Sequence, residues 1–412
     1  MQIFTIPYMT GKISLPSSPL IEYIRLGLEH QAIPLSSGQP HPSFFPLEAL
    51  GDASQKGIRE MGDRFLRYGS SRGIGPLRSW ILEWMQRDGI CSPEVSEEEI
   101  LLVPGCQFGF DLLCQAFLQP GDLVAMDAPC YPDSWCTLQR RGAKILPLSV
   151  DDEGLSVEHL EKHLAEGARP KFLYTIPTYQ NPRGCSLSCY RITRLTELAE
   201  KYNFYILLDD PYRFLPLDEE LRRGDAYFPW HGWETKRIIW MSSFSKILAP
   251  GLRSGWIIAP REIVALLGAL QEMSCISPPA LGSLGIYVYL RDYGIEPQLR
   301  FLAKELSSRR GILLSEMEKS SLFSRGCSLA KALGGTFLSL FLPSSLEASP
   351  VARMLTIQKK VATIPEKAFW PPLEKGRKEP DRFLRLSYSW IHPEEGAPCV
   401  KALEEVMESC GY

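Results

Sequence analysis

The feature that most constrains the fold is a series of short apolar segments that alternate with amphipathic helical patterns from about residue 98 onward. Between the segments, apolar residues recur at helical spacing, for example at Phe110, Leu113 and Phe117. Near-continuous apolar strands that alternate with helices are typical of a mainly parallel sheet covered on both faces. The sequence therefore predicts an α/β fold with a seven-stranded sheet, whose strands cover residues 100–103, 123–126, 144–150, 172–176, 205–208, 238–241 and 255–259.

The two ends of the chain differ from its centre. Residues 1–45 are rich in Pro, Ser and Gly and show weak periodicity. The pattern after about residue 290 is helical, with one alternating, strand-like segment at 383–389. We therefore expect a large domain over residues 46–289 and a smaller α+β domain over residues 290–412. The N-terminal segment is expected to join the smaller domain, so that both chain ends build it.

Composition and charge argue against several other classes of protein. The 45 basic and 48 acidic residues give a net charge of −3, unlike the basic surface of a nucleic-acid-binding protein. No uninterrupted apolar run reaches about 18 residues, so no membrane span is expected. The chain start lacks a secretory pattern, so the eleven cysteines indicate reduced thiols in the cytoplasm. Neither a Cys-x-x-Cys nor a His-Glu-x-x-His pattern occurs, so no metal site is expected.

Sheets of this kind bind ligands at the carboxyl ends of their strands, and the strongest candidate site follows the sixth segment. There the chain reads Ser-Ser-Phe-Ser-Lys-Ile-Leu-Ala-Pro-Gly-Leu-Arg-Ser-Gly. The lysine, Lys246, can form a Schiff base with an aldehyde. Ser243, Ser245 and Arg253 can hold a phosphate through hydroxyl groups and a guanidinium group. The alternative is a surface loop with ordinary serine and lysine residues.

The pattern Ser-x-Ser-Lys-x-x-x-Pro-Gly-Leu-Arg-x-Gly resembles the cofactor-lysine motif of fold-type I pyridoxal-phosphate enzymes. It is most similar to that of the class I/II aminotransferases, in the group of the 2-aminoadipate and kynurenine aminotransferases and the effector domains of MocR-type regulators. The resemblance extends from about Gly38 to Arg385. It implies the type I transferase fold, pyridoxal 5′-phosphate as cofactor, and Lys246 as the catalytic lysine.

Two further elements carry the same resemblance. An Asp-x-x-Tyr element follows the fifth segment, and by this match Asp209 contacts the pyridine nitrogen while Tyr212 donates to the ring oxygen of the cofactor. The three-residue spacing to Tyr212 selects Asp209, with Asp210 as the alternative. A Gln-Asn-Pro-x-Gly turn follows the fourth segment, and there the resemblance implies that Asn181 binds the same ring oxygen.

The phosphate and ring contacts are implied in the same way. A Pro-Gly turn before a predicted helix offers free amide groups to a phosphate, and the resemblance assigns the amides of Cys106 and Gln107 to this contact. The family often has a small hydroxyl residue at the position of Cys106. Tyr131 matches an aromatic residue that stacks on the pyridine ring; the alternative is a tyrosine of the core.

The remaining assignments concern the substrate and a second subunit. Arg385 matches the family arginine that clamps the α-carboxylate of the substrate; the alternative is a surface arginine, such as the neighbouring Arg382. Gly38 resembles part of a loop that closes over the substrate, and Asn181 also belongs to the substrate site. Tyr68 resembles the tyrosine that reaches the phosphate of the neighbouring subunit, which implies a homodimer with a shared active site.

The resemblance implies an aminotransferase of amino-acid metabolism, which moves an amino group between an α-amino acid and a 2-oxo acid such as 2-oxoglutarate by a ping-pong mechanism. A lyase or decarboxylase on the same scaffold, or a non-catalytic regulatory module, are the alternatives. Relatives that act on aminoadipate often carry an N-terminal arginine for the distal carboxylate. Here Ser18–Ile21 ends in apolar residues and Arg25 is the nearest cation, which favours an aromatic or aliphatic amino donor. Neither nucleic acid nor a membrane is an expected partner.

Overall fold

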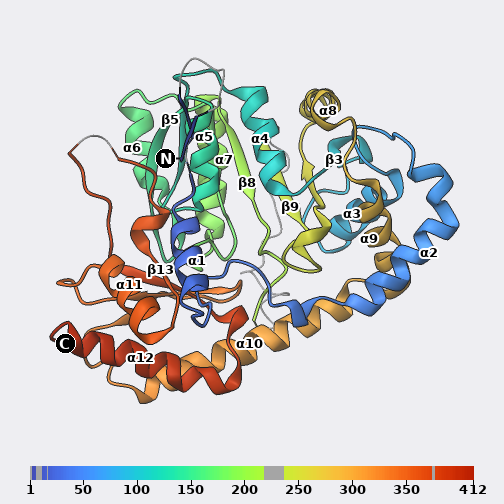
Figure 1. Cartoon of the computed structure of the whole chain (residues 1–412). Coiled ribbons are helices and arrows are strands. Elements are labelled where there is room, and N and C mark those ends of the chain that lie inside the picture. The colour runs from blue at the N-terminus through green and yellow to red at the C-terminus, as the bar shows by residue number, and fades with distance from the viewer. Residues whose placement is uncertain (1, 6–11, 16, 218–235, 374–375) are drawn as a thin grey trace.

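The computed structural model describes residues 2–5, 12–15, 17–217, 236–373 and 376–412. Its centre is a sheet of eight strands (Figure 1). In spatial order these are β3 (Ile100–Val103), β10 (Gly255–Ile258), β9 (Ile238–Ser243), β8 (Tyr205–Asp209), β7 (Phe172–Thr175), β4 (Leu123–Ala128), β5 (Lys144–Asp151) and β6 (Gly154–Leu155).

The seven segments predicted from the sequence all form strands of this sheet. The five strands from β9 to β5 pair in parallel, whereas β10 runs antiparallel to both β9 and β3. The eighth strand, β6, is a two-residue strand antiparallel to β5, too short to leave a periodic pattern in the sequence. Every residue of β3, β7, β9 and β10 is buried, and so is every residue of β8 except the half-buried Tyr205, as expected for strands covered on both faces.

Helices pack along the sheet, and a helix pair flanks it. The helices that contact sheet strands are α3 (Gly75–Arg87), α4 (Cys106–Phe117), α5 (Pro132–Arg140), α6 (Val157–Ala165), α7 (Cys189–Tyr202) and α8 (Arg261–Cys275). Next to them, α2 (Leu47–Phe65) lies along α9 (Ala280–Tyr293). Gly57 and Gly285 permit this close approach, because a Cβ at Gly57 would lie 3.0 Å from the Leu284 side chain and one at Gly285 only 2.5 Å from Ser54 Oγ.

A second, antiparallel sheet lies in the C-terminal part of the chain, in the order β11 (Ser328–Leu329), β12 (Phe337–Phe341), β14 (Phe383–Ser387) and β13 (Ile364–Pro365). The strand predicted at 383–389 is β14. The helices of this region are α10 (Glu296–Lys319), α11 (Ala348–Lys359) and α12 (Gly396–Ser409). The chain start adds a hairpin, β1 (Gln2–Thr5) and β2 (Lys12–Leu15), and the helix α1 (Leu20–Glu29).

The N-terminal segment lies beside the C-terminal part, as the blue α1 next to the orange α11 shows (Figure 1). The Ile33 amide donates to Lys360 O at 2.8 Å, and the Ala362 amide donates to Ile33 O at 2.9 Å. These contacts agree with a small domain built from both chain ends, although the limits at residues 45 and 290 stay predictions. No helix in the described ranges is long and apolar enough to cross a membrane.

Candidate functional site

The carboxyl ends of the parallel strands bring the predicted residues to one edge of the large sheet. Strand β8 ends at Asp209 and β9 ends at Ser243, and these strands are neighbours in parallel register. The turn that carries Lys246 follows β9 directly, with Phe244, Ile247 and Leu248 buried beneath it. The topology therefore places a lysine and a carboxylate side by side, as expected for an α/β ligand site.

Asp209 is buried at this edge, and one of its two carboxylate oxygens accepts a hydrogen bond. Its Oδ2 accepts a hydrogen bond from the Tyr174 hydroxyl at 2.7 Å. Its Oδ1 is buried and has no hydrogen-bond partner among the described residues. Burial raises the pKa of Asp209 to about 6, although the Tyr174 hydrogen bond opposes this shift. A buried carboxylate oxygen of this kind fits a ligand that brings its own N–H donor and positive charge.

Asp210, the alternative to Asp209, makes contacts of a different kind. Its Oδ2 lies 3.2 Å from Arg213 Nη1 and accepts from Trp240 Nε1 at 3.1 Å. Its carbonyl oxygen accepts from Ser242 Oγ at 2.9 Å. Asp210 thus belongs to a buried ion pair that holds the loop after β8.

Lys246 lies where its amine can act as a nucleophile. Its Nζ donates to Gly38 O at 2.8 Å and lies 5.7 Å from the ring centroid of Tyr212. Burial, and next the nearby Arg385, lower the pKa of Lys246 to about 8, although Asp209 opposes the shift. A lysine whose amine is partly neutral near physiological pH is suited to attack an aldehyde.

Arg385 joins three distant parts of the chain. From β14, its Nη1 donates to Asn181 Oδ1 at 3.0 Å, and its Nη2 donates to Ser36 O at 2.6 Å. Its Nε is buried without a partner among the described residues, and Phe337 packs against the guanidinium at 4.2 Å. Burial lowers the pKa of Arg385 to about 10. The neighbouring Arg382, by contrast, is exposed.

Asn181 and Tyr212 complete this side of the site. Both are buried, and the Asn181 amide interacts with the Tyr212 phenol. Burial raises the pKa of Tyr212, while Arg385 and the Asn181 amide lower it. The phenol therefore stays protonated at neutral pH and can donate a hydrogen bond.

Groups that can bind an anion gather at the N-terminus of α4, a region called the cup below. Gly105, at φ +85°, precedes the helix and offers no side-chain cap, so the first amide groups are open. Arg253 Nη2 donates to Pro104 O at 2.9 Å, and a Cβ at Gly105 would collide with this guanidinium. Ser243 Oγ accepts from the Ser245 amide at 3.3 Å. The cup thus gathers amides, hydroxyls and a cation that fit an anion.

The thiol at this cup belongs to Cys106, the first residue of α4, and it interacts with Ser243 and Asp209. Burial raises the pKa of this thiol, so it stays protonated. Gln107 turns its side chain away, because its Nε2 donates to Thr137 Oγ1 at 2.9 Å. Only the backbone of Gln107 is left for the cup.

Tyr131 lies immediately before α5, and its hydroxyl donates to the Asp133 carboxylate. Burial, and next Asp133, raise its pKa well above the usual value, and it interacts with Tyr212 and Asp209. Tyr68 does not join this cluster: it follows α2 and is 86% exposed. The structure therefore brings together every predicted site residue except Tyr68.

Sequence reasoning missed two residues of this site, Tyr174 and Gln180. The sequence predicts Tyr174 only as part of an apolar strand, although a buried tyrosine needs a partner for its hydroxyl. Asp127 and Gln180 lie beside predicted residues and share a hydrogen bond at 3.2 Å. The sequence does point to Asp127, because it directly follows the apolar segment 123–126 where a ligand site is expected, but it gives Asp127 no role.

Residues 30–401 match the family model described as aminotransferase class I and II. The chain belongs to this family. An aromatic-amino-acid aminotransferase of Thermococcus litoralis is 29% identical over 96% of this chain and 93% of its own length. A 2-aminoadipate transaminase of Thermus thermophilus is 27% identical over 97% of this chain and 96% of its own.

Solved structures agree with this assignment. The Pyrococcus horikoshii kynurenine aminotransferase, solved with pyridoxamine phosphate, superimposes with a TM-score of 0.86 at 27% identity and covers 96% of this chain and 95% of its own. The resemblance and the type I fold are thereby confirmed. The chain is a pyridoxal-phosphate-dependent aminotransferase.

The residues present fit this cofactor. Asp209 Oδ1 is free for the pyridine nitrogen, the cup at α4 fits the phosphate, and Lys246 offers an amine for the aldehyde. No group of three or more His, Cys, Asp or Glu side chains that could hold a metal occurs in the part of the chain that the structure describes.

We expect Asp209→Asn to lower cofactor affinity and Asp210→Asn to lower stability. The first substitution removes the charge opposite the pyridine nitrogen, so cofactor affinity falls while folding is retained. The second removes the negative charge from the buried ion pair of Asp210 with Arg213, so the free energy of unfolding falls. Cofactor titration and urea unfolding of the apo form measure the two effects. Equal loss of cofactor affinity in both variants would contradict the assignment.

The lowered pKa of Lys246 predicts a pH dependence of cofactor uptake. Only the neutral amine attacks an aldehyde, and the folded-state pKa is about 8. The rate at which the apo form develops its visible band should therefore rise with pH and level off above pH 8, as stopped-flow absorbance measures. A rise that continues through about pH 10 would indicate an ordinary lysine.

Proposed function

We propose that the protein transfers the amino group of an α-amino acid with an aromatic or aliphatic side chain to a 2-oxo acid such as 2-oxoglutarate. The observation that carries this proposal is the convergence of Lys246, Asp209 and Arg385 at one sheet edge. The three supply an amine, an anion and a carboxylate-binding cation, each with burial that shifts its pKa.

Each residue has a distinct task in the proposed mechanism. The bound cofactor supplies an electron sink for the bonds at the substrate Cα. Arg385 binds the substrate carboxylate through its planar guanidinium and so orients the Cα–H bond. With the cofactor bound, Lys246 Nζ would act as the general acid–base group that takes the proton from the substrate Cα and holds it in the site.

The other residues maintain the charge state of the site. With the cofactor bound, Asp209 would keep the pyridine nitrogen protonated, and the Tyr131 ring would offer it a flat apolar surface. Tyr212 and Asn181 would donate hydrogen bonds to the ring oxygen. Gly38 and Ser36 lie on one loop, and their carbonyl oxygens accept hydrogen bonds from Lys246 Nζ and Arg385 Nη2. Substrate binding therefore requires these two hydrogen bonds to break.

The preference for an apolar side chain is supported by α1. Its exposed residues include Ile21, Ile24 and Leu28, which are 53%, 42% and 74% exposed and lie at helical spacing. Arg25 lies 3.3 Å from Glu29 in an ion pair. This helix therefore offers apolar surface rather than an unpaired cation for a distal carboxylate.

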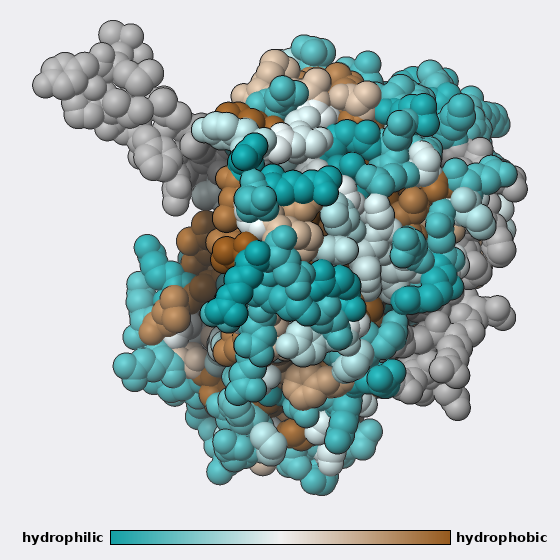
Figure 2. Space-filling view, turned by 90° about the vertical axis from the view of Figure 1, so that its right-hand side faces the viewer, coloured by the Kyte–Doolittle hydropathy of each residue, from teal (hydrophilic) through white to brown (hydrophobic). Residues whose placement is uncertain are grey.

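A homodimer with a shared active site belongs to the same proposal. Exposed apolar residues occur in the segment of Tyr68, at Leu66, and in a second region at the end of α8 and the start of α9, at Met273, Ile276 and Leu281. Gln271 connects the two regions, since its Nε2 donates to Ser71 O. Figure 2, which views the side of the molecule where α2 lies, shows apolar surface gathered toward one edge. Such surface is typical of an interface.

The cytoplasmic location inferred from the cysteines belongs to the proposal as well.

A panel of amino donors with 2-oxoglutarate as the acceptor tests the proposed reaction. We expect glutamate to form fastest with aromatic or aliphatic donors, with the ping-pong kinetics of two half-reactions. Strict preference for aminoadipate would contradict the proposed substrate class. Pyruvate with ammonia from a single amino acid would indicate a lyase, and a cofactor-loaded protein that turns over no donor would indicate a regulatory module.

A further inference from the structure

The side chain of Gln180 is buried next to the site and is fully engaged with other parts of the chain. Its Nε2 donates to Asp127 Oδ2 at 3.2 Å and to Pro129 O at 2.8 Å, and its Oε1 accepts from the Arg183 amide at 3.0 Å. Both hydrogens of the amide group and one lone pair of its oxygen are thereby used. A side chain so committed has a single orientation.

These bonds join two loops that carry site residues. Asp127 and Pro129 lie at the end of β4, in the connection that continues to Tyr131. Gln180 lies in the turn after β7 and is adjacent to Asn181 in the chain. Asp127 Oδ2 also accepts from the Ile176 amide at 3.1 Å. One buried carboxylate oxygen therefore holds both the beginning and the middle of the Asn181 turn.

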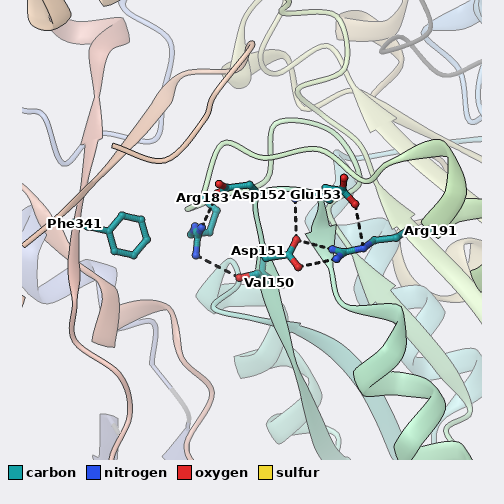
Figure 3. Close-up of a pocket in the computed structure, with 7 residues that line it drawn as sticks. All are labelled: Val150, Asp151, Asp152, Glu153, Arg183, Arg191 and Phe341. Atoms are coloured by element: carbon teal, nitrogen blue, oxygen red, sulfur yellow. Dashed lines mark hydrogen bonds and ion pairs between the residues drawn. The ribbon is translucent and has the colours of Figure 1, made fainter. Parts of the chain in front are cut away.

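The same turn is anchored on its outer side by Arg183. The Arg183 guanidinium donates to Val150 O at 3.3 Å and to Asp152 at 3.2 Å, and it lies 4.9 Å from the ring of Phe341 in β12. Figure 3 shows it between that ring and the β5 strand, at the edge of a cavity of about 490 Å³. The backbone amide of Arg183 donates to Gln180 Oε1, so Gln180 is bonded both to Asp127 and to the residue that anchors the outer side of the turn.

The turn contacts the proposed substrate-binding arginine, Arg385, through Asn181. Asn181 Oδ1 accepts from Arg385 Nη1, and the Asn181 amide interacts with the Tyr212 phenol. A rotation of the turn would therefore move the acceptor that fixes the guanidinium plane of Arg385. Displacements of about 1 Å at such a group are enough to change rates by up to about 100-fold.

We propose that Gln180, held by Asp127, is a positioning residue that fixes Asn181 and, through it, the carboxylate-binding orientation of Arg385. Gln180 touches neither substrate nor cofactor in this role. The inference rests on the proposed function, because it assigns a second layer of residues to the same site.

Gln180→Met tests the proposal, because methionine keeps the approximate volume of the side chain but removes its three side-chain hydrogen bonds. We expect the KM values for amino donor and 2-oxo acid to rise together about tenfold, with a smaller change in kcat, since Arg385 binds the carboxylate of both substrates. We also expect the pH midpoint of the visible band of the holoenzyme to move upward by about one unit, because Asn181 is displaced from the ring oxygen.

Gln298→Glu is the matched control for a merely structural effect. Gln298 is also buried, and its Nε2 donates to the backbone oxygen of Phe44 at 2.8 Å. This variant should lose stability in urea unfolding, yet keep the wild-type KM values and spectral midpoint. If Gln180→Met loses stability alone and matches the wild type in KM and midpoint, the proposal is overturned.

A double-mutant cycle with Asp127 tests whether the two residues act as one unit. Asp127→Leu should reproduce the rise in KM, and the double variant with Gln180→Met should be no worse than the more affected single variant. Asp127→Asn keeps an oxygen for the Gln180 amide and should stay within about threefold of the wild type. Additive effects would overturn the shared role. If the wild-type protein itself transaminates no donor, the proposed function fails first, whatever the Gln180 variants show.

Discussion

Lys246→Ala is expected to abolish the visible absorption band of the cofactor-loaded protein and to lower kcat by about 10⁴-fold, the upper range for a general acid–base group. The amine lies in the same buried site as Asp209 and Arg385, and its pKa of about 8 keeps part of it neutral, whereas burial keeps the Cys106 thiol protonated. Absorbance spectroscopy and single-turnover kinetics measure the two losses.

The fold should survive this substitution. Burying a cation costs free energy, and among the described residues Lys246 Nζ makes one hydrogen bond, to Gly38 O. The apo variant is therefore expected to be at least as stable as the wild type. Lys171→Ala is the control, because Lys171 lies at the opposite end of the large sheet, just before β7, and is 54% exposed. A Lys246→Ala protein that keeps its visible band would contradict the assignment of the catalytic lysine.

Arg385→Lys has the second largest expected effect. Lysine keeps the positive charge but loses the planar, two-pronged donor set, so one charged hydrogen bond to the carboxylate is lost. Such a bond contributes about 1.5–3 kcal/mol, and we expect the KM values for amino donor and 2-oxo acid to rise by about 10–100-fold. Cofactor binding should change little, because Arg385 lies on the substrate side of the site. Steady-state kinetics with both substrates measures this.

Arg382→Lys provides the matched control. Arg382 lies three residues away in the same segment and is exposed, so the same chemical change there should leave both KM values unchanged. If the two variants behave alike, the carboxylate clamp lies elsewhere. If Arg385→Lys raises the KM of the amino donor alone, the guanidinium binds a side chain rather than the α-carboxylate shared by both substrates.

The large sheet could be predicted from the sequence because its strands are buried on both faces. A strand such as Ile238–Ser243 has no exposed face, so an uninterrupted apolar run, here from Ile238 to Met241, marks its position directly. The two-residue strand β6 escapes this reasoning, since no period can be detected in Gly154–Leu155. The parallel arrangement then predicts that the carboxyl ends of these strands, and with them the site, lie at one edge of the sheet.

The first layer of the site could be predicted as well, since Lys246, Asp209 and Asn181 each follow a recognisable strand. The second layer could not. Gln180 meets Asp127, 53 residues away, through a contact that only the folded chain creates. The same holds for Ser36 and Arg385, which are 349 residues apart. A tyrosine in an apolar strand, such as Tyr174, does not reveal from sequence whether its hydroxyl meets a catalytic carboxylate.

The most direct test of the account is to locate the covalent bond between protein and cofactor. The wild-type protein is loaded with pyridoxal phosphate, treated with borohydride to make the bond permanent, digested and mapped by mass spectrometry. We expect one modified peptide, with the cofactor on Lys246 and in an amount that matches the visible absorbance. Modification at another lysine, or the absence of any modified peptide from protein that shows the visible band, would contradict it.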